Sequence, residues 1–255
     1  MKQHRHKTLA AAMAAALALV ACGGDDAADD PDNEPVDSVA EEPANEPAAE
    51  PADEPADEPS NEMNGPRSTV PPDLPEEYLE AVGAVDIMGE SLPPLETDDI
   101  DSDPAVGMPA PTVVGADFDG NPVRIDAAAD GPTMVVFLAH WCPHCNAEIP
   151  VLNELRDGGR FPEELNIVAV STAPDPTRPH FPPAAWLMEK DWTYPVVADG
   201  VDPASPNPWL AAGAFGLSGF PFAVLIDDDG AVAARWSGEQ DPDVTIETIE
   251  ARLGL

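Results

Sequence analysis

Positively charged residues are scarce in this chain of 255 residues. It has 11 lysines and arginines against 49 aspartates and glutamates, which gives a formal net charge of −38. A protein that binds nucleic acid, or that attaches to anionic lipid through a polybasic patch, needs lysine and arginine to meet the phosphates. The composition argues against both partners. The sequence also lacks an uninterrupted apolar run of about 18 to 20 residues, the length that a transmembrane helix requires.

Cysteine is scarce too, with three in the whole chain. The first, Cys22, follows a segment with the pattern of an export signal, in which basic residues come first and an apolar run over 9–20 follows. The tetrapeptide Leu19-Val20-Ala21-Cys22 resembles a bacterial lipobox. We therefore predict a lipoprotein signal peptide over 1–21, a lipid anchor at Cys22, and a location on the extracytoplasmic face of a bacterial membrane. The alternative is an ordinary secretory signal beside an unrelated cysteine.

Residues 22–72 are rich in Pro, Ala, Asp and Glu, and they contain a short tandem repeat over 51–59. Such a segment has too few apolar side chains to offset chain entropy, so it is predicted to be a disordered acidic tether. At about 5–6 Å × √n it reaches roughly 40 Å, enough to hold a domain away from a membrane. A specific binding role for the acidic repeat is the alternative. Residues 73–105 are predicted to be a linker with a short helix over about 75–85.

The remaining residues, 106–255, are enough for one domain. In the sequence pattern of these residues, expected strands and helices alternate, and a β-hairpin and a last helix follow them. This order predicts an α/β fold with a mixed central sheet and helices on both faces. The expected strands are 111–115, 122–125, 133–139, 165–171, 194–198, 222–227 and 231–236, and the expected helices are 143–156, 183–190, 208–215 and 244–253. Asp119-Gly120-Asn121, between the first two strands, predicts that they form a hairpin. Asp243 is expected to cap the last helix, whose apolar face would be Val244, Ile246, Ile249 and Leu253.

The strongest chemical signal is the run His140-Trp141-Cys142-Pro143-His144-Cys145, directly after the apolar stretch 133–139. A strand that feeds a Cys-x-x-Cys at the start of a helix is typical of a redox dithiol. The helix N-terminus offers a positive end and free N–H groups that favour a thiolate. The spacing allows Cys142 and Cys145 to cycle between dithiol and disulfide.

Three motifs together resemble the thioredoxin fold and, within it, the TlpA/ResA-like membrane-anchored thiol–disulfide oxidoreductases. They are the opening 106–111, the redox motif 141–145, and Gly219-Phe220-Pro221 just before an expected strand. The resemblance implies a thioredoxin-like three-layer fold, a redoxin domain that needs no cofactor and no metal, and a dithiol that serves cysteine-containing exported proteins. A membrane or extracytoplasmic redox partner would recycle it.

The resemblance also implies roles for single residues. Cys142 would be the exposed nucleophile, and Cys145, more buried, would resolve the mixed disulfide. Pro221 would be cis and face the two sulfurs, so that the backbone of Phe220 can pair with a substrate segment like an added strand. Trp141 and Gly219 would lie beside that segment.

Two further residues are candidates for tuning the dithiol. Glu148 lies where the ResA branch carries a glutamate near the thiols, and it would accept the proton of Cys145; the alternative is a solvated helix glutamate. Pro143-His144 is the dipeptide found between the cysteines of DsbA. His144 beside Cys142 would stabilise the thiolate and make the disulfide more oxidising; the alternative is a surface histidine with little effect. His140 is open to either packing or tuning.

Other functions remain as alternatives. His140, His144 and the cysteines could hold copper or zinc, although ligands from one contiguous stretch do not easily form a tetrahedron. A thiol peroxidase would need a Thr or Ser three residues before Cys142, where the chain has Ala139. A binding lipoprotein without redox activity would have no need of both cysteines. The direction of electron flow is left open between oxidase and reductase.

Overall fold

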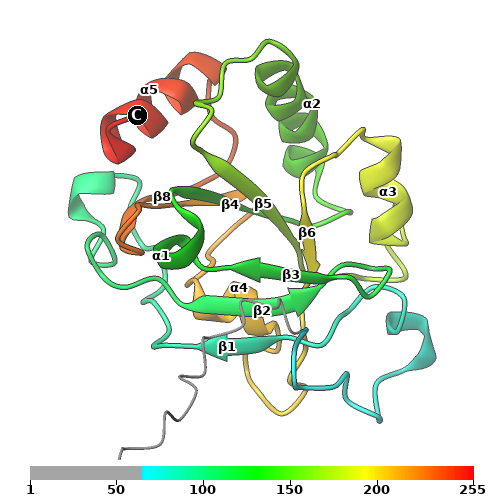
Figure 1. The fold of residues 1–255 in the computed structure, drawn as a ribbon. Helices are drawn as coiled ribbons and strands as arrows, with labels where there is room; N and C mark the ends of the chain where they lie inside the picture. Colours follow the sequence, from blue (N-terminus) through cyan, green and yellow to red (C-terminus); the bar gives the residue numbers. More distant parts are fainter. Residues whose placement is uncertain (1–64) are drawn as a thin grey trace, which may run out of the picture. The chain divides into compact units, whose positions relative to one another are not determined.

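The computed structural model describes residues 65–255, so Cys22, the predicted signal peptide and most of the predicted tether lie outside the described residues. The centre of the fold is a five-stranded sheet with the order β6-β5-β4-β7-β8 (Figure 1). β4 is parallel to β5 and antiparallel to β7, so the sheet is mixed. The strands are β4 (Thr133–Leu138), β5 (Asn166–Ser171), β6 (Val196–Ala198), β7 (Phe222–Ile226) and β8 (Val232–Ser237).

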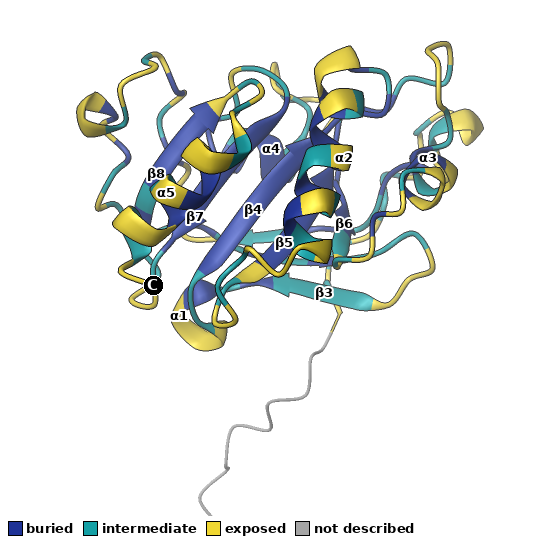
Figure 2. Ribbon diagram, turned by 90° about the horizontal axis from the view of Figure 1, so that it is seen from above, coloured by how far each residue is buried: buried dark blue, intermediate teal, exposed yellow. Residues whose placement is uncertain are grey.

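β4 is buried along its whole length, as its apolar sequence predicts (Figure 2). Successive side chains of a strand point to opposite faces of the sheet. Met134, Val136 and Leu138 therefore join one hydrophobic cluster, whereas Val135 and Phe137 join a second cluster on the other face. The sheet thus separates two cores, and each needs its own covering layer.

Helices α2 (Pro143–Asp157), α3 (Pro183–Glu189) and α5 (Pro242–Leu253) cover the first cluster, and α4 (Leu210–Ala214) lies on the opposite face (Figure 1). That face is also covered by a small antiparallel sheet of β1 (Asp86–Met88), β2 (Thr112–Ala116) and β3 (Pro122–Ile125). A short helix, α1 (Ala127–Asp130), was not predicted. The arrangement confirms the predicted three-layer α/β fold. No helix within residues 65–255 is both long and apolar enough to cross a bilayer.

The predicted hairpin over β2 and β3 is confirmed. The N–H of Asp117 donates to the carbonyl of Asn121 at 2.9 Å, and the Asp117 carboxylate accepts the N–H groups of Asp119 and Asn121. Gly120 closes the turn with a φ of 84°, a conformation that costs glycine little because it has no Cβ. This turn sets the pairing of Gly115 with Val123.

Residues 73–105 differ from the predicted linker with a short helix. The segment holds only 3-10 turns at Glu76–Tyr78 and Ile100–Ser102 and the strand β1. Val85, Leu92 and Leu95 are buried in the second cluster. The backbone N–H groups of Leu92 and Leu95 donate to the carbonyls of Ala214 and Gly216 at 2.8 and 3.0 Å, just where α4 ends. The segment is extended because its apolar residues pack along this face rather than along one side of a helix.

A buried ion pair fixes the end of that segment. Arg235, within β8, and Asp103 both have fully enclosed side chains, and the guanidinium binds the carboxylate through two hydrogen bonds of 2.8 and 2.6 Å. Its Nη1 donates to the carbonyls of Pro93 and Phe215. Burial by itself raises the pKa of Asp103, but the hydrogen bonds from Arg235 and from the Ala105 N–H outweigh it and lower the pKa. A charge in the core is tolerated because the carboxylate neutralises it and each guanidinium nitrogen donates at least one hydrogen bond.

The last helix begins earlier than predicted. Asp241, not Asp243, is the cap, and its carboxylate accepts the N–H of Asp243 at 2.9 Å while Pro242 takes the first helical position. Asp243 instead pairs with Arg160 at 2.8 Å. Ile246 and Ile249 are buried as predicted, but Val244 is 47% exposed, because at the start of the helix it lies outside the buried face.

Candidate active site

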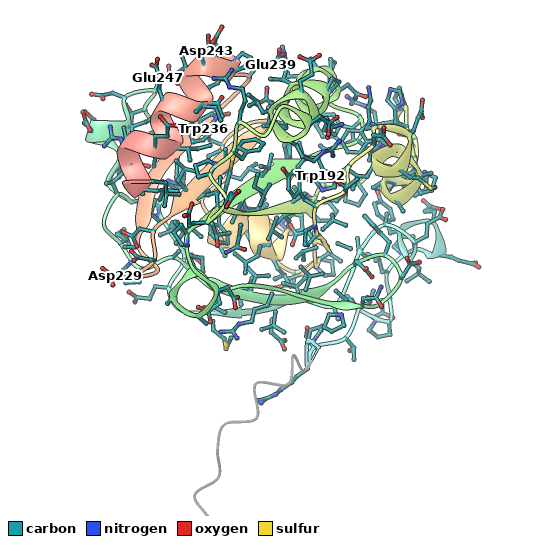
Figure 3. All side chains as sticks on the ribbon, turned by 45° about the horizontal axis from the view of Figure 1, so that its top comes forward. Trp192, Asp229, Trp236, Glu239, Asp243 and Glu247 are labelled. Carbon is teal, nitrogen blue, oxygen red and sulfur yellow. The ribbon has the colours of Figure 1, made fainter. Side chains whose placement is uncertain are left out.

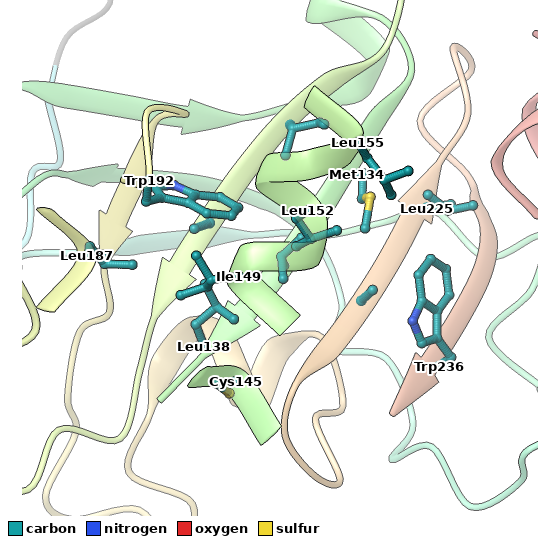
Figure 4. Packing of buried hydrophobic residues seen from close by; sticks show 14 of the residues in the cluster. Met134, Leu138, Cys145, Ile149, Leu152, Leu155, Leu187, Trp192, Leu225 and Trp236 are labelled. Atoms are coloured by element: carbon teal, nitrogen blue, oxygen red, sulfur yellow. The ribbon is translucent and has the colours of Figure 1, made fainter. Parts of the chain in front are cut away.

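Both cysteines lie where β4 leads into α2, and both are free thiols. Cys142 is the N-cap residue of α2, with an extended backbone, and Pro143 follows as the first helical residue. The N–H of Cys142 donates to the carbonyl of Ala139 at 3.0 Å, which holds the connection from the strand. Cys145 lies at the beginning of α2, at the same end of the first cluster as Leu138 and Ile149 (Figure 4).

The expectation of an exposed nucleophile at Cys142 needs correction. Cys142 is only 5% exposed, and Cys145 has no exposed surface. The Sγ of Cys142 lies 3.9 Å from the carbonyl oxygen of Phe220, so the loop before β7 covers it. The predicted order of burial still holds. A partner sulfur can therefore reach Cys142 only at its small exposed surface, and cannot reach Cys145 directly.

Cys145 is a poor thiolate in this environment. Burial raises the pKa of its thiol well above the usual range, and the nearby Cys142 and Glu148 add to the increase. The Ala139 N–H, 3.5 Å from its Sγ, opposes the increase without cancelling it. Cys145 consequently keeps its proton in the dithiol state and has to give it to a base before it can attack.

The peptide bond between Phe220 and Pro221 is cis, as predicted. That Pro221 faces the two sulfurs stays a prediction. The carbonyl of Pro221 accepts the N–H of Gly238 at 2.8 Å. A Cβ at Gly219 would lie 2.6 Å from the Ser237 Oγ, so any other residue there would have to displace that side chain. The close packing holds the carbonyl of Phe220 toward Cys142.

The indole of Trp141 forms a fixed surface beside the dithiol. Its Nε1–H donates to the carbonyl of Ala173 at 2.7 Å, and its ring meets the ring of Phe220 edge-on at a centroid distance of 5.7 Å. The guanidinium of Arg178 lies over the face of the indole, with its Cζ 4.6 Å from the ring centroid. Sequence reasoning missed Arg178. A signal did exist, because the loop after β5 leaves the sheet beside the end of β4, and Arg178 is its basic residue.

Glu148 is not a solvated helix glutamate, because it is only 4% exposed. Burial raises its pKa to about 7, and the charge of Glu239 adds to the increase, while a hydrogen bond from the Gln240 N–H opposes it. Among the residues that the structure describes, its Oε2 has no hydrogen-bond partner. A carboxyl that titrates near neutral pH close to a high-pKa thiol has the properties of a proton acceptor. Its role in catalysis stays a prediction.

His144 is exposed, and its Nδ1 lies 2.6 Å from the Oε1 of Glu239. Figure 3 shows Glu239 between α5 and α2. The loop between β8 and α5 therefore contacts the site through three successive residues: Gly238 binds Pro221, Glu239 pairs with His144, and the Gln240 N–H reaches Glu148. No local sequence signal pointed to Glu239, because its partner lies 95 positions away.

His140 is fully buried and packs against the ring of Phe181. Its Nε2 accepts the N–H of Asp175 at 3.1 Å, which leaves the proton on Nδ1, where it is donated to the carbonyl of Pro179 at 2.7 Å. Burial lowers its pKa, in keeping with a neutral ring. Of the two alternatives for His140, the structure favours packing. Both nitrogens bind the 175–179 loop, so the ring is not available as a metal ligand in this arrangement.

Comparison with known proteins places this chain among thiol-based redox proteins. The family model described as Redoxin matches residues 105–253. The thiol-disulfide oxidoreductase ResA of Bacillus cereus is 26% identical over 149 residues, which cover 58% of this chain and 76% of ResA. The methylamine utilization protein MauD of Paracoccus versutus is 24% identical over 151 residues, 59% of this chain and 68% of MauD. A crystal structure of a thioredoxin-family thiol:disulfide interchange protein from Chlorobium tepidum TLS is 24% identical, covers 57% of this chain and 96% of that one, and has a TM-score of 0.45.

Proposed function

Because the chain belongs to the redoxin family and is a thiol–disulfide oxidoreductase, we propose that Cys142 and Cys145 are its redox pair and that they exchange with cysteines of exported proteins. The observation that carries this proposal is the pair of free thiols at the start of α2, with the carbonyl of Phe220 3.9 Å from the Cys142 Sγ. A second, extracytoplasmic or membrane-bound redox protein returns the pair to its starting state.

In the reducing direction, the Cys142 thiolate attacks one sulfur of a partner disulfide. The other partner sulfur leaves as a thiolate, and a mixed disulfide remains. Cys145 then gives its proton to Glu148 and attacks the Cys142 sulfur, which releases the second partner thiolate and leaves a Cys142–Cys145 disulfide. The partner gains two electrons and the protein loses two. The oxidising direction is the same sequence reversed.

Cysteine variants test this assignment. Cys145→Ser should trap mixed disulfides through Cys142, since the resolving thiol is gone, whereas Cys142→Ser should trap far fewer because no reachable nucleophile is left. Tryptic mapping of the trapped species identifies the linked cysteine. Adducts at Cys145 in the unaltered chain would show that the two roles are assigned the wrong way round.

The direction of transfer is open, and the reduction potential decides it. The DsbA-like dipeptide Pro143-His144 supports an oxidant with a potential between about −270 mV, as in thioredoxin, and about −120 mV, as in DsbA. We expect His144→Ala to make the potential more negative in glutathione buffers. If it leaves the potential unchanged, His144 has no part in tuning the pair and a reductase becomes the better assignment.

We further propose that the protein works outside the cytosol on a lipid anchor. The basic start, the apolar run over 9–20 and the lipobox-like Leu19-Val20-Ala21-Cys22 support cleavage before Cys22 and its lipidation. Residues 22–72 would then be the acidic tether to the domain. Cys22→Ala should leave the precursor unprocessed or release the protein from membranes. An intact mass of the native protein with an unmodified Cys22 would exclude the anchor.

A further inference from the structure

A short strip of side chains leads from Cys142 to an arginine. Cys142 lies against the carbonyl of Phe220, the ring of Phe220 meets the indole of Trp141, and the guanidinium of Arg178 lies on that indole. The hydrogen bond from Trp141 to the carbonyl of Ala173 fixes the middle of the strip. A substrate segment that pairs with the backbone of Phe220 would pass along it.

Arg178 differs from most of the basic residues around it. Five arginines within 65–255 pair with a carboxylate, namely Arg124, Arg156, Arg160, Arg235 and Arg252. In the same part of the chain, the Arg178 guanidinium has neither an ion pair nor a hydrogen bond; only its backbone N–H is bonded, to the Asp175 carbonyl. The carboxylate of Asp175 instead accepts two hydrogen bonds from Thr177, at 2.9 and 2.7 Å.

We propose that Arg178 binds a carboxylate of the substrate, on a residue next to the cysteine that reacts with Cys142. Stacking on an indole uses the face of a guanidinium and leaves its N–H edge free for an anion. A carboxylate fits this edge because it accepts two parallel hydrogen bonds. The inference rests on the proposed function, since it names a substrate class for the same site.

The strongly negative net charge of the protein narrows the class of substrate that Arg178 can bind. With a net charge of −38, the protein repels an acidic partner at long range. Such repulsion is screened over about 8–10 Å at ordinary ionic strength, whereas a direct contact with Arg178 acts within a few ångströms. The substrate that fits is therefore a neutral or basic segment that carries one acidic side chain beside its cysteine.

Matched peptide disulfides test the proposal. Three fluorogenic peptides would differ only in a Glu, Gln or Lys next to the cysteine, and the reduced full-length protein would cleave them. The wild type should prefer Glu over Lys by about twofold to fivefold in kcat/KM, the range of an exposed ion pair. Arg178→Gln should abolish the preference, Arg178→Glu should reverse it, and Arg178→Lys should restore part of it. Added salt should shrink it.

Arg160→Gln is the matched control, because Arg160 is another exposed arginine, at the far end of α2, and is paired with Asp243. A preference that survives in Arg178→Gln, or that Arg160→Gln removes equally, overturns the proposal. Failure to cleave even the Gln peptide would instead count against the proposed function. A binding experiment then tests the role of Arg178 separately from catalysis. The same peptides carry Ser in place of Cys, and tryptophan fluorescence reports their binding. Equal binding of the Glu and Lys peptides overturns the carboxylate site at Arg178, and a preference for the Glu peptide that is lost in Arg178→Gln supports it.

Discussion

Replacing Glu148 with Gln should stabilise the protein at alkaline pH while it slows thiol exchange. Glu148 is 4% exposed, and burial followed by the charge of Glu239 raises its pKa from the ordinary value of 4.5 to about 7. At about 1.36 kcal/mol for each pH unit between these values, ionising the buried carboxyl costs at most about 3 kcal/mol of folding free energy. Gln keeps the shape of the side chain and removes that cost.

The sign of the effect follows from proton binding. Between pH 4.5 and about 7 the folded protein keeps the Glu148 proton while the unfolded chain has lost it, so stability falls as the pH rises through this window. Below the window Glu148→Gln should be nearly neutral. Above it the variant should be more stable than the wild type by up to about 3 kcal/mol, an upper limit because water can relax around the charge.

Urea unfolding of both proteins at pH 5, 6, 7 and 8 measures this difference, with both kept reduced because a disulfide would change the stability of each. Glu154→Gln, an exposed glutamate on the same helix, is the control. The rate of thiol exchange should drop in Glu148→Gln but not in the control, because Cys145 would lose its proton acceptor. A stability difference that is the same at pH 5 and pH 8 would refute the reasoning.

Further predictions concern the buried ion pair and the loop before α5. Asp103→Ala should lower the free energy of unfolding by about 3–5 kcal/mol, because it leaves the Arg235 guanidinium buried without a counter-charge, and a double replacement by apolar residues should recover much of the loss in urea unfolding. Burial alone would raise the pKa of Asp103, but the hydrogen bonds from Arg235 outweigh burial, and the pKa is lowered. The stability that this pair contributes should therefore be present above about pH 3.8 and be lost as the pH falls further. Acid unfolding of the wild type and the double variant checks this, and equal acid sensitivity of the two would contradict it. Glu239→Gln should lower the pKa of Glu148, because it removes a like charge. His144→Ala should raise the pKa of Glu148, because it removes the partner of Glu239. NMR of the Glu148 carboxyl carbon measures both pKa shifts, and shifts of the same sign would be evidence against the coupling of Glu148 to Glu239.

The parts of the fold that rest on neighbouring residues were predictable. The apolar run 133–139 and the turn at Gly120 each determine their local structure, and β4 and the β2–β3 hairpin are found where expected. The same holds for the position of Cys142 and Cys145 at the start of α2, because an apolar strand followed by their spacing is itself the signal.

Features that depend on distant residues were not predictable. Cys142 was expected to be exposed, but Phe220, 78 positions later, covers it. The segment 73–105 was expected to be a linker, but Asp103 meets Arg235 132 positions away. The sequence does carry one signal of this contact, because an arginine inside the apolar strand β8 needs a buried acceptor somewhere in the chain. Val244 is exposed because the buried face of α5 is formed by Thr245, Ile246 and Ile249, and at 100° per residue Val244 lies off that face.

The Asp103–Arg235 pair also shows that the folded domain begins before the region that matches the family model. The family match begins at residue 105, two positions after Asp103. A protein trimmed to the match would keep the whole redox motif, yet it would lose the carboxylate that neutralises Arg235 and the carbonyl of Pro93 that binds the same guanidinium. A fusion partner or an affinity tag should therefore be joined before Ala81, the first buried residue of the segment, so that the domain carries its own counter-charge.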